Sequence, residues 1–182
     1  MVEIANAVGS GDIGVELDIA EVAADLSVPY TEYDPENYHG LYVRIVEDGP
    51  LITLYRSGKY IISGCSSFEE LDETNHAFLQ VISELDGIET SLETGFTVEN
   101  VVCTGELQQS VNLNALAIGL GLEAVEYEPE QFPGLIYRPE SFPAVLLLFA
   151  NGNVVITGAA DLETAEEAFS HLQTQVKDLL FD

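Results

Sequence analysis

Basic residues are almost absent from this chain of 182 residues. Lysine and arginine together number five, against 32 aspartate and glutamate residues, which gives a formal net charge of −27. The acidic residues are spread along the whole chain, which excludes an acidic tail and indicates a solvated acidic surface. Hydrophobic residues make up 47% of the chain and exclude disorder. A hydrophobic core under an acidic, lysine-poor surface predicts a protein that works in molar salt, although an ordinary acidic interaction protein is the alternative.

Long apolar segments and metal-ligand patterns are also missing. The longest uninterrupted apolar run, AVLLLFA at 144–150, is far too short to span a membrane. The start, MVEIANAV, lacks the basic region and the apolar stretch of a signal peptide. Cys65 and Cys103 have no metal-ligand spacing and are expected to be reduced, buried thiols. We therefore expect a cytoplasmic protein with no membrane segment, no metal and no cofactor.

What the chain does contain is an internal repeat at a constant distance of 94 residues. The segment EYEPEQFPGLIYR at 126–138 is a near-copy of EYDPENYHGLYVR at 32–44. Without a gap, the same shift pairs Asn6 with Asn100, Val8 with Val102, Leu26 with Leu120, Tyr33 with Tyr127, Gly40 with Gly134, Arg44 with Arg138, Tyr55 with Phe149, Gly58 with Gly152 and Gly64 with Gly158. Solenoids use shorter periods and at least three copies. The sequence therefore predicts two pseudo-symmetric copies of one small unit, in residues 1–90 and 91–182, with 86–97 as the connection.

Each copy is expected to contain a strand, a helix, four strands and a second helix. In the first copy we expect a strand at 4–14, a helix at 16–26, an extended segment and turn at 31–40, strands at 41–46, 51–55 and 59–63, and a helix at 66–85. The last helix opens with a Ser-x-x-Glu capping pattern, either Ser66 to Glu69 or Ser67 to Glu70. In the second copy we expect a strand at 98–107, a helix near 112–120, strands near 124–157 and a helix at 162–180.

The strands predict an unusual sheet. Short links between them favour antiparallel pairing. In LITLY, KYIIS, VLLLF and NVVIT, both alternating sets of side chains are largely apolar. A sheet with helices on one face usually carries polar residues on the other. The open face is therefore expected to be apolar and to bind something.

The segment PEQFPGLIYR, followed by LLLFANGNVVITGA and a helix rich in glutamate and alanine, resembles the TATA-binding protein family, especially its archaeal members. The resemblance extends from about Asn6 to about Leu180 and is stronger in the second copy. It implies an α+β saddle in which two repeats form one curved ten-stranded antiparallel sheet. The concave face would grip the minor groove of DNA, and four helices would lie on the convex face.

The resemblance also implies that two aromatic pairs wedge between base steps and kink the DNA. The second-copy pair is Phe132 and Phe149. In the first copy the matching positions carry Tyr38 and Tyr55, both departures from phenylalanine. A tyrosine can still stack, but its hydroxyl must then find a partner. The alternative is that these rings pack in the core.

Base contacts are implied for residues that match the centre of the family's binding face. Asn6 and Asn100 would donate to adenine N3 and thymine O2, the acceptors that A·T pairs offer in the minor groove. A lone asparagine at such a position is more often a cap or turn residue. A second polar pair and an apolar floor that disfavours the guanine amino group are implied at Ser63 and Thr157, and at Val8, Ile61, Val102, Leu147 and Val155.

Phosphate contacts are implied for few residues. Arg44 and Arg138 match a family arginine, and Lys59 matches the lysine of a Ser-Gly-Lys turn. The second copy has Asn153 where that lysine is expected. Each phosphate contact adds affinity through counterion release. Because this chain has few such residues and a net charge of −27, it should bind DNA poorly at low salt.

A partner surface is implied by PEQF in the second copy. In the family this loop receives transcription factor B, through acidic and apolar side chains. Glu128, Glu130 and Gln131 are therefore expected to contact that factor, unless these glutamates are only surface charge.

Three functions follow as hypotheses. The first is a general archaeal transcription initiation factor that binds and bends double-stranded TATA DNA and recruits transcription factor B and RNA polymerase. It would act in the nucleoid, as a monomer on DNA and as a homodimer without it.

The second is a diverged paralogue that acts as a protein-interaction module, favoured by Tyr38, His39, Tyr55 and Asn153. The third is a base-excision glycosylase, whose helix-hairpin-helix glycine motif and catalytic lysine and aspartate are not found, so we expect no enzyme and no catalytic residues.

Overall fold

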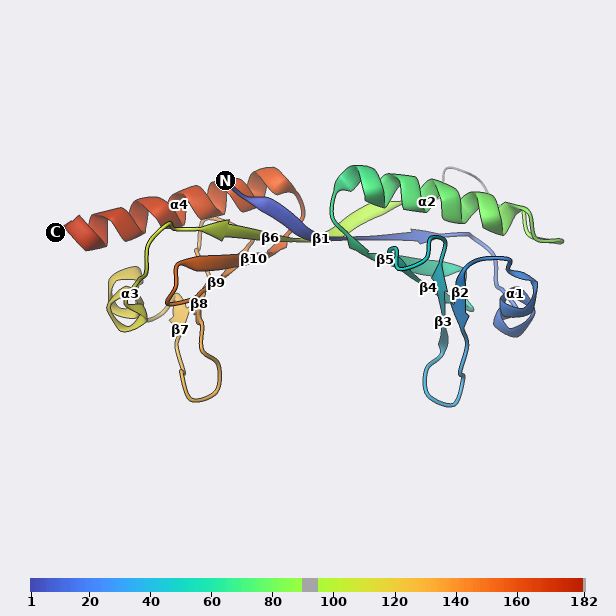
Figure 1. The fold of residues 1–182 in the computed structure, drawn as a ribbon, viewed down its shortest axis with the longest axis horizontal. Helices are drawn as coiled ribbons and strands as arrows, with labels where there is room; N and C mark the ends of the chain where they lie inside the picture. The colour runs from blue at the N-terminus through green and yellow to red at the C-terminus, as the bar shows by residue number, and fades with distance from the viewer. Residues whose placement is uncertain (90–94, 182) are drawn as a thin grey trace. The chain divides into compact units, whose positions relative to one another are not determined.

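The computed structural model describes residues 1–89 and 95–181 (Figure 1). The chain divides into two compact units. We call Asn6–Glu99 the N-terminal unit, and Met1–Ala5 together with Asn100–Asp182 the C-terminal unit. The repeat boundary expected between residues 90 and 91 lies outside the described residues, as does part of the expected connection at 86–97.

The N-terminal unit follows the predicted order of elements. Its elements are β1 (Glu3–Asp12, whose first residues belong to the C-terminal unit), α1 (Ile19–Asp25), β2 (Tyr30–Glu32), β3 (Gly40–Arg44), β4 (Leu51–Tyr55), β5 (Lys59–Cys65) and α2 (Phe68–Ser83). The strands lie in the order β2-β3-β4-β5-β1, and each described pair is antiparallel.

The C-terminal unit repeats this arrangement. Its elements are β6 (Thr97–Glu106, which starts in the N-terminal unit), α3 (Leu113–Leu120), β7 (Val125–Glu126), β8 (Leu135–Tyr137), β9 (Val145–Leu148), β10 (Asn153–Ala159) and α4 (Leu162–Phe181). The strands lie in the order β6-β10-β9-β8-β7, with antiparallel pairing. Within residues 1–89 and 95–181, one ten-stranded sheet and four helices confirm the predicted α+β class.

Several predicted boundaries in the N-terminal unit were wrong by two or three residues, and two of them have a local cause. The first helix begins at Ile19 and not at residue 16, because the side chain of Asp18 accepts a hydrogen bond from the Glu21 amide and caps the helix. The third strand ends at Arg44 and not at residue 46, because the chain turns there and leaves Val46 exposed. In both places the pattern of apolar residues extended beyond the element, because a capping hydrogen bond sets the start of the helix and a turn sets the end of the strand.

The capping pattern of α2 is resolved in favour of Ser67. The Ser67 hydroxyl accepts a hydrogen bond from the Glu70 amide at 3.1 Å. The Glu70 carboxylate in turn accepts from the amide and the hydroxyl of Ser66, at 2.6 and 2.8 Å. These bonds, the backbone one first, lower the pKa of Glu70. The start of α2 is therefore fixed by reciprocal hydrogen bonds.

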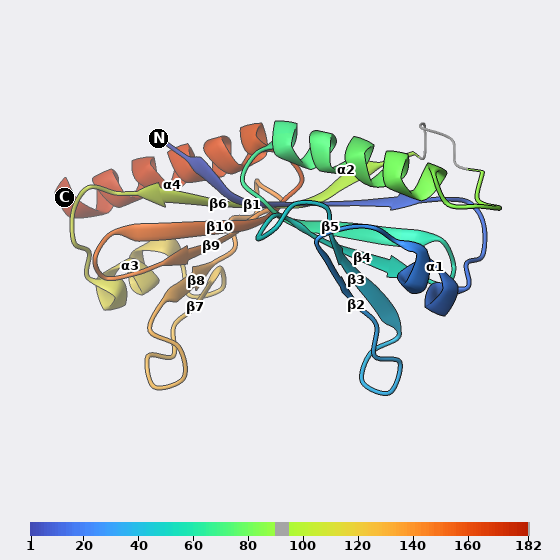
Figure 2. The same cartoon turned by 45° about the vertical axis from the view of Figure 1, so that its right-hand side comes forward.

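In each unit one long helix covers one face of the strands. Figures 1 and 2 show α2 running along the N-terminal strands and α4 along the C-terminal strands. Under α2, the Tyr60 ring lies 4.8 Å from the Phe78 ring, and its hydroxyl donates to Asn75 at 2.6 Å. The buried side chains on the covered faces of the strands include Leu41, Val43, Ile52, Leu54 and Ile62, and Leu146, Leu148, Val154 and Ile156; Phe169 of α4 is buried as well.

The two cysteines are buried thiols, one in each unit, as predicted. Cys65 ends β5 on the covered face, where burial and the nearby Glu70 charge raise its pKa to about 11. Cys103 lies in β6, and burial and then Glu166 raise its pKa. Both thiols are therefore protonated and unreactive at neutral pH.

No described helix is long and apolar enough to cross a membrane.

Candidate nucleic-acid interface

The predicted DNA-binding residues of the strands lie on the face opposite the helices. Along each strand, fully buried side chains of the covered face alternate with half-buried or exposed ones. Cross-strand pairs such as Val155 with Leu147 and Ile61 with Thr53 share the open side. On this open face or at its edge lie Asn6, Val8, Arg44, Tyr55, Lys59, Ile61 and Ser63 of one unit, and Asn100, Val102, Arg138, Leu147, Phe149, Val155 and Thr157 of the other.

Tyr38 and Phe132 lie on loops, and each folds back over its own open face. The Phe132 and Phe149 rings meet edge to face with centroids 5.9 Å apart. The Tyr38 and Tyr55 rings meet in the same way at 6.3 Å. All four rings are half-buried and lie outside the fully buried core. The structure therefore brings together both aromatic pairs that the sequence predicted.

A glycine beneath each pair makes this arrangement possible. A Cβ atom on Gly134 would lie 2.7 Å from the Phe132 ring and 3.1 Å from the Phe149 ring. A Cβ atom on Gly40 would lie 2.8 Å from the Tyr38 ring and 3.2 Å from the Tyr55 ring. Since real Cβ atoms keep a larger distance, only glycine leaves room for the rings on the strand.

The tyrosine pair differs from the phenylalanine pair by an internal hydrogen bond. The hydroxyl oxygens of Tyr38 and Tyr55 lie 2.7 Å apart. Burial, and then the hydrogen bond to Tyr38, raise the pKa of Tyr55 to about 12. The two tyrosine hydroxyls are therefore hydrogen-bonded to each other, an interaction that the two phenylalanine rings cannot make.

Asn6 and Asn100 occupy equivalent, hydrogen-bonded positions. The Asn6 side-chain oxygen accepts from the Gly64 amide at 2.8 Å, and the Asn100 oxygen accepts from the Gly158 amide at 3.2 Å. Each acceptor is thereby used within its own unit. Across residues 1–89 and 95–181 neither amide nitrogen donates a hydrogen bond, so both remain available as donors.

Both predicted phosphate-binding arginines already have partners. Arg44 donates to the Gly49 carbonyl and lies 6.0 Å from the centre of the Tyr30 ring. Arg138 forms an exposed ion pair with Glu126 at 2.9 Å. A phosphate would therefore have to compete with these contacts.

The matched strand ends carry different charges in the two units. In the N-terminal unit Lys59 lies opposite Asp12. In the C-terminal unit the equivalent pair is Asn153 opposite Glu106. The cation that balances the acid in one unit is therefore replaced by a neutral side chain in the other.

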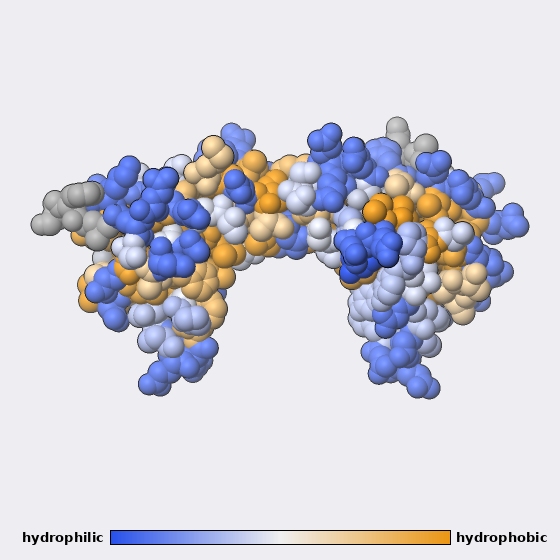
Figure 3. All heavy atoms as spheres, viewed as in Figure 1, coloured by the Kyte–Doolittle hydropathy of each residue, from blue (hydrophilic) through white to orange (hydrophobic). Residues whose placement is uncertain are grey.

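The predicted partner-binding residues lie on the loop between β7 and β8, which projects from the strands (Figure 1). Glu128, Glu130 and Gln131 are all exposed. The amides of Gln131 and Phe132 both donate to the Glu128 carbonyl, at 2.9 and 3.0 Å, and close the loop. Figure 3 shows hydrophilic side chains at the loop tip, and the two exposed glutamates place negative charge on the same loop as Phe132.

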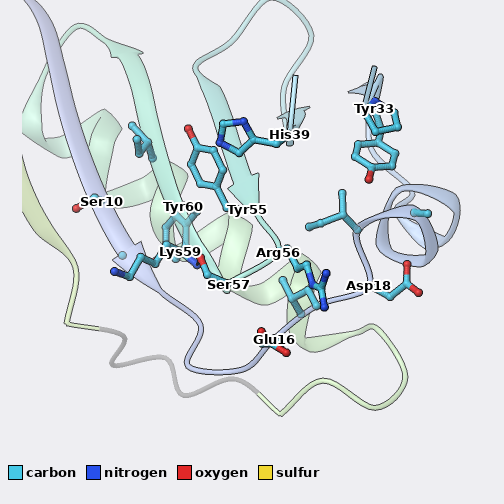
Figure 4. Close-up of a pocket in the computed structure, with 16 residues that line it drawn as sticks. Ser10, Glu16, Asp18, Tyr33, His39, Tyr55, Arg56, Ser57, Lys59 and Tyr60 are labelled. Atoms are coloured by element: carbon cyan, nitrogen blue, oxygen red, sulfur yellow. Dashed lines mark hydrogen bonds between the residues drawn. The ribbon is translucent and has the colours of Figure 1, made fainter. Parts of the chain in front are cut away.

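An open hollow of about 1130 Å³ lies within the N-terminal unit and is lined by one basic residue, Arg56, to which the sequence analysis gave no role (Figure 4). Arg56 and Lys59, two of the five lysines and arginines, line it together with His39. Glu16 and Asp18 line it as well, so its charge is mixed. Arg56 could have been found from its rarity alone. Tyr42 and Thr53 were also missed, although each lies two residues from a predicted residue of the same strand, Arg44 or Tyr55, so alternation along the strand could have found them.

No group of three or more histidine, cysteine or acidic side chains in the described part of the chain is arranged to hold a metal ion. The chemistry of the open faces is that of hydrogen-bond donors, apolar side chains and aromatic rings.

Comparison with known proteins points in the same direction. The family model described as transcription factor TFIID, or TATA-binding protein, matches residues 1–85 and 95–179. TATA-box-binding protein C of Halobacterium salinarum is 66% identical over 98% of this chain and 99% of its own length. A TATA-box-binding protein of Haloarcula marismortui is 40% identical over 98% of this chain and 94% of its own. A solved structure, the Methanococcus jannaschii TBP, superposes with a TM-score of 0.81 and 37% identity, covering 97% of this chain and 98% of that one.

Proposed function

Because the chain belongs to the haloarchaeal TATA-binding protein family, whose members are DNA-binding transcription initiation factors, we propose that it binds A·T-rich promoter DNA in the minor groove and bends it. Each unit supplies its open face to part of the site. The transcription machinery then assembles on the bent DNA.

The observation that carries this proposal is the matched pair of asparagines. Two amide groups at equivalent positions have their acceptors occupied and their donors unused. The minor groove of A·T pairs presents only acceptors, adenine N3 and thymine O2. The apolar side chains around Asn100, such as Val102 and Val155, would leave a guanine amino group without a partner.

Insertion of aromatic rings supplies the bend. Phe132 and Phe149 have no polar atom to desolvate, so they can enter a base step and unstack it. Arg44, Arg138 and Lys59 then position the backbone of the DNA. Since the arginines must exchange Gly49 and Glu126 for phosphates, they contribute little affinity.

The experiment that tests this function measures the end-to-end distance of a duplex with an A·T-rich promoter sequence, labelled with a fluorophore at each end. In about 2 M potassium chloride, where the charge of the protein is screened, we expect the protein to shorten this distance. A protein that binds transcription factors but never bends the duplex would fit the second candidate, a protein-interaction module. The Tyr38–Tyr55 hydrogen bond and the Asn153 substitution favour that candidate.

We further propose that transcription factor B binds the loop between β7 and β8. Changing Glu128 and Glu130 to lysine is expected to weaken its recruitment to the DNA complex about tenfold, because each exposed charge contact contributes up to about 1 kcal/mol. Binding of DNA alone should be unchanged or slightly tighter, since two negative charges are replaced by two positive ones. Electrophoretic mobility shifts with and without transcription factor B measure both.

A matched control is the loop between β2 and β3. Asp34 and Glu36 are exposed there, at the positions that correspond to Glu128 and Glu130 under the shift of 94 residues. Reversing those two charges should leave recruitment unchanged. Equal effects in the two loops would remove Glu128, Glu130 and Gln131 from the proposed partner site.

The remaining parts of the proposal concern assembly. The complex with transcription factor B would recruit RNA polymerase, in the nucleoid of a cell with high internal salt. One copy of the chain would act on each DNA site. Without DNA, the apolar open faces would favour a homodimer.

A further inference from the structure

The open faces of the two units differ at four neighbouring positions. In the C-terminal unit these positions are purely hydrocarbon, and in the N-terminal unit all four carry a hydroxyl group. At the constant distance of 94 residues, Tyr38 replaces Phe132, Tyr42 replaces Ile136, Thr53 replaces Leu147 and Tyr55 replaces Phe149.

The four hydroxyl-bearing residues form one cluster. Tyr42 lies directly opposite Thr53 on the neighbouring strand. The Tyr38 ring stacks on the Tyr42 ring at 5.3 Å with an interplanar angle of 2°. The Tyr38 and Tyr55 hydroxyls are hydrogen-bonded, and the Thr53 methyl group, the Tyr38 ring and the Tyr55 ring all surround Gly40. We call Tyr38, Tyr42, Thr53 and Tyr55 the hydroxyl cluster.

The hydroxyl cluster has unused hydrogen-bonding capacity. Thr53 is 9% exposed, yet its hydroxyl makes no hydrogen bond within the part of the chain that the structure describes. The same holds there for the Tyr42 hydroxyl. In the Tyr38–Tyr55 pair one hydroxyl donates and the other accepts, so lone pairs remain on both oxygens. A buried hydroxyl without a partner is costly, which indicates that a ligand supplies one.

The ligand on this face, given the proposed function, is the minor groove of DNA. There an A·T pair offers only acceptors, and a G·C pair adds one donor, the guanine amino group. A hydrocarbon surface leaves that donor unpaired, whereas a hydroxyl oxygen can accept from it. We infer that the hydroxyl cluster lets the N-terminal unit accept a G·C pair in its half of the DNA site, while the C-terminal unit requires A·T pairs.

This inference rests on the proposed function and makes it more specific. The recognition sequence becomes asymmetric, because only one half of it admits guanine. The asymmetry also determines the orientation of the protein on the DNA, since a G·C pair in one half of the site directs the N-terminal unit to that half.

A test that needs no knowledge of orientation uses a self-complementary A·T-rich duplex. A single G·C pair in one half should change the dissociation constant less than about threefold, because the protein can turn its N-terminal unit toward it. A second G·C pair at the symmetry-related position must face the C-terminal unit. It should weaken binding about tenfold, the usual cost of one mismatched pair.

The matched variant replaces the hydroxyl cluster by the residues of the other unit: Tyr38→Phe, Tyr42→Ile, Thr53→Leu and Tyr55→Phe. In this variant the first G·C pair should already weaken binding about tenfold. Since four simultaneous changes can prevent folding, two milder variants are measured beside it. They are Tyr38→Phe with Tyr55→Phe, which removes only two oxygens, and Thr53→Val, which keeps the shape of the side chain.

The outcomes separate this inference from the function on which it rests. Absence of binding to the unsubstituted duplex overturns both. Binding with equal losses for the first and the second G·C pair overturns the inference alone, as does unchanged tolerance of guanine in both milder variants. Loss of tolerance in either of them supports it. If these variants keep that tolerance and lose only the recruitment of transcription factor B, the hydroxyl cluster is a protein-binding surface and the inference is wrong.

Discussion

Replacing Phe132 or Phe149 by alanine is expected to weaken binding of A·T-rich promoter DNA by about 1–3 kcal/mol each, or about 5- to 150-fold in the dissociation constant. The two rings meet edge to face over Gly134 and carry no polar atom. Losing either ring removes stacking on a base and part of the wedge. Titration of a labelled duplex, followed by fluorescence anisotropy, measures the loss.

The equivalent change Tyr38→Ala should cost less. Its hydroxyl is joined to Tyr55, so insertion of the Tyr38 ring is already opposed by the need to keep or replace that bond. Phe142→Ala serves as a control, because Phe142 is a half-buried ring of the C-terminal unit that lies beside His171 of α4. Equal losses at Phe132, Phe149 and Tyr38 would indicate a symmetric wedge and contradict the assignment.

The second large effect is a reversed dependence on salt. Ordinary DNA-binding proteins lose affinity as salt rises, because each neutralised phosphate releases counterions. We expect the affinity of this chain for promoter DNA to rise with potassium concentration from about 0.2 M to above about 1 M. Its net charge of −27 repels DNA, and at about 0.01 M salt that repulsion extends over about 30 Å.

The contacts of the basic residues explain why counterion release is small. Arg44 and Arg138 are engaged within the protein, which leaves Lys59 as the only predicted phosphate ligand not held by an acid or a carbonyl in the described hydrogen bonds and ion pairs. Glu106 lies opposite the neutral Asn153 and would approach the DNA without a balancing charge. A cation must then be taken up on binding, and burial of the apolar open faces is strengthened by salting-out ions.

Binding titrations at several potassium concentrations test the salt dependence, with folding checked by circular dichroism at each point. The variant Asn153→Lys restores the cation opposite Glu106 and should flatten the rise. An affinity that falls throughout the range would exclude cation uptake, and with it the expectation that the chain works in molar salt.

Much of the fold was predictable because two periodicities coincide in this sequence. The shift of 94 residues predicted each element twice, and alternation along the strands predicted which side chains share a face. The open face was expected to be apolar beside its predicted polar pairs, and this is correct for Leu147 and Val155 of the C-terminal unit but not for Thr53 of the N-terminal unit. Sequence alone could not reveal that Thr53 lies beside Tyr42, because strand register is a property of pairing and not of composition.

The sequence predicted which residues form the candidate site, but not the hydrogen bonds that these residues make. The resemblance placed Tyr38 and Tyr55 together, but the hydrogen bond between them depends on the orientation of two hydroxyls from different segments. The same holds for Arg44, whose partner Gly49 lies on the turn after its strand. Such contacts decide whether a side chain is free to meet a ligand, and they emerge only from coordinates.

The two buried cysteines make the protein a reporter of its own stability. Cys65 and Cys103 lie in different units, and burial keeps both thiols protonated and out of reach of alkylating reagents. Alkylation therefore records the opening of each unit separately, resolved by mass spectrometry of the two peptides. A third cysteine placed at a loop tip would react much faster than the native pair. Fluorescent dyes could then be attached to the loops of the otherwise unaltered chain, and the movement of one loop on DNA followed directly.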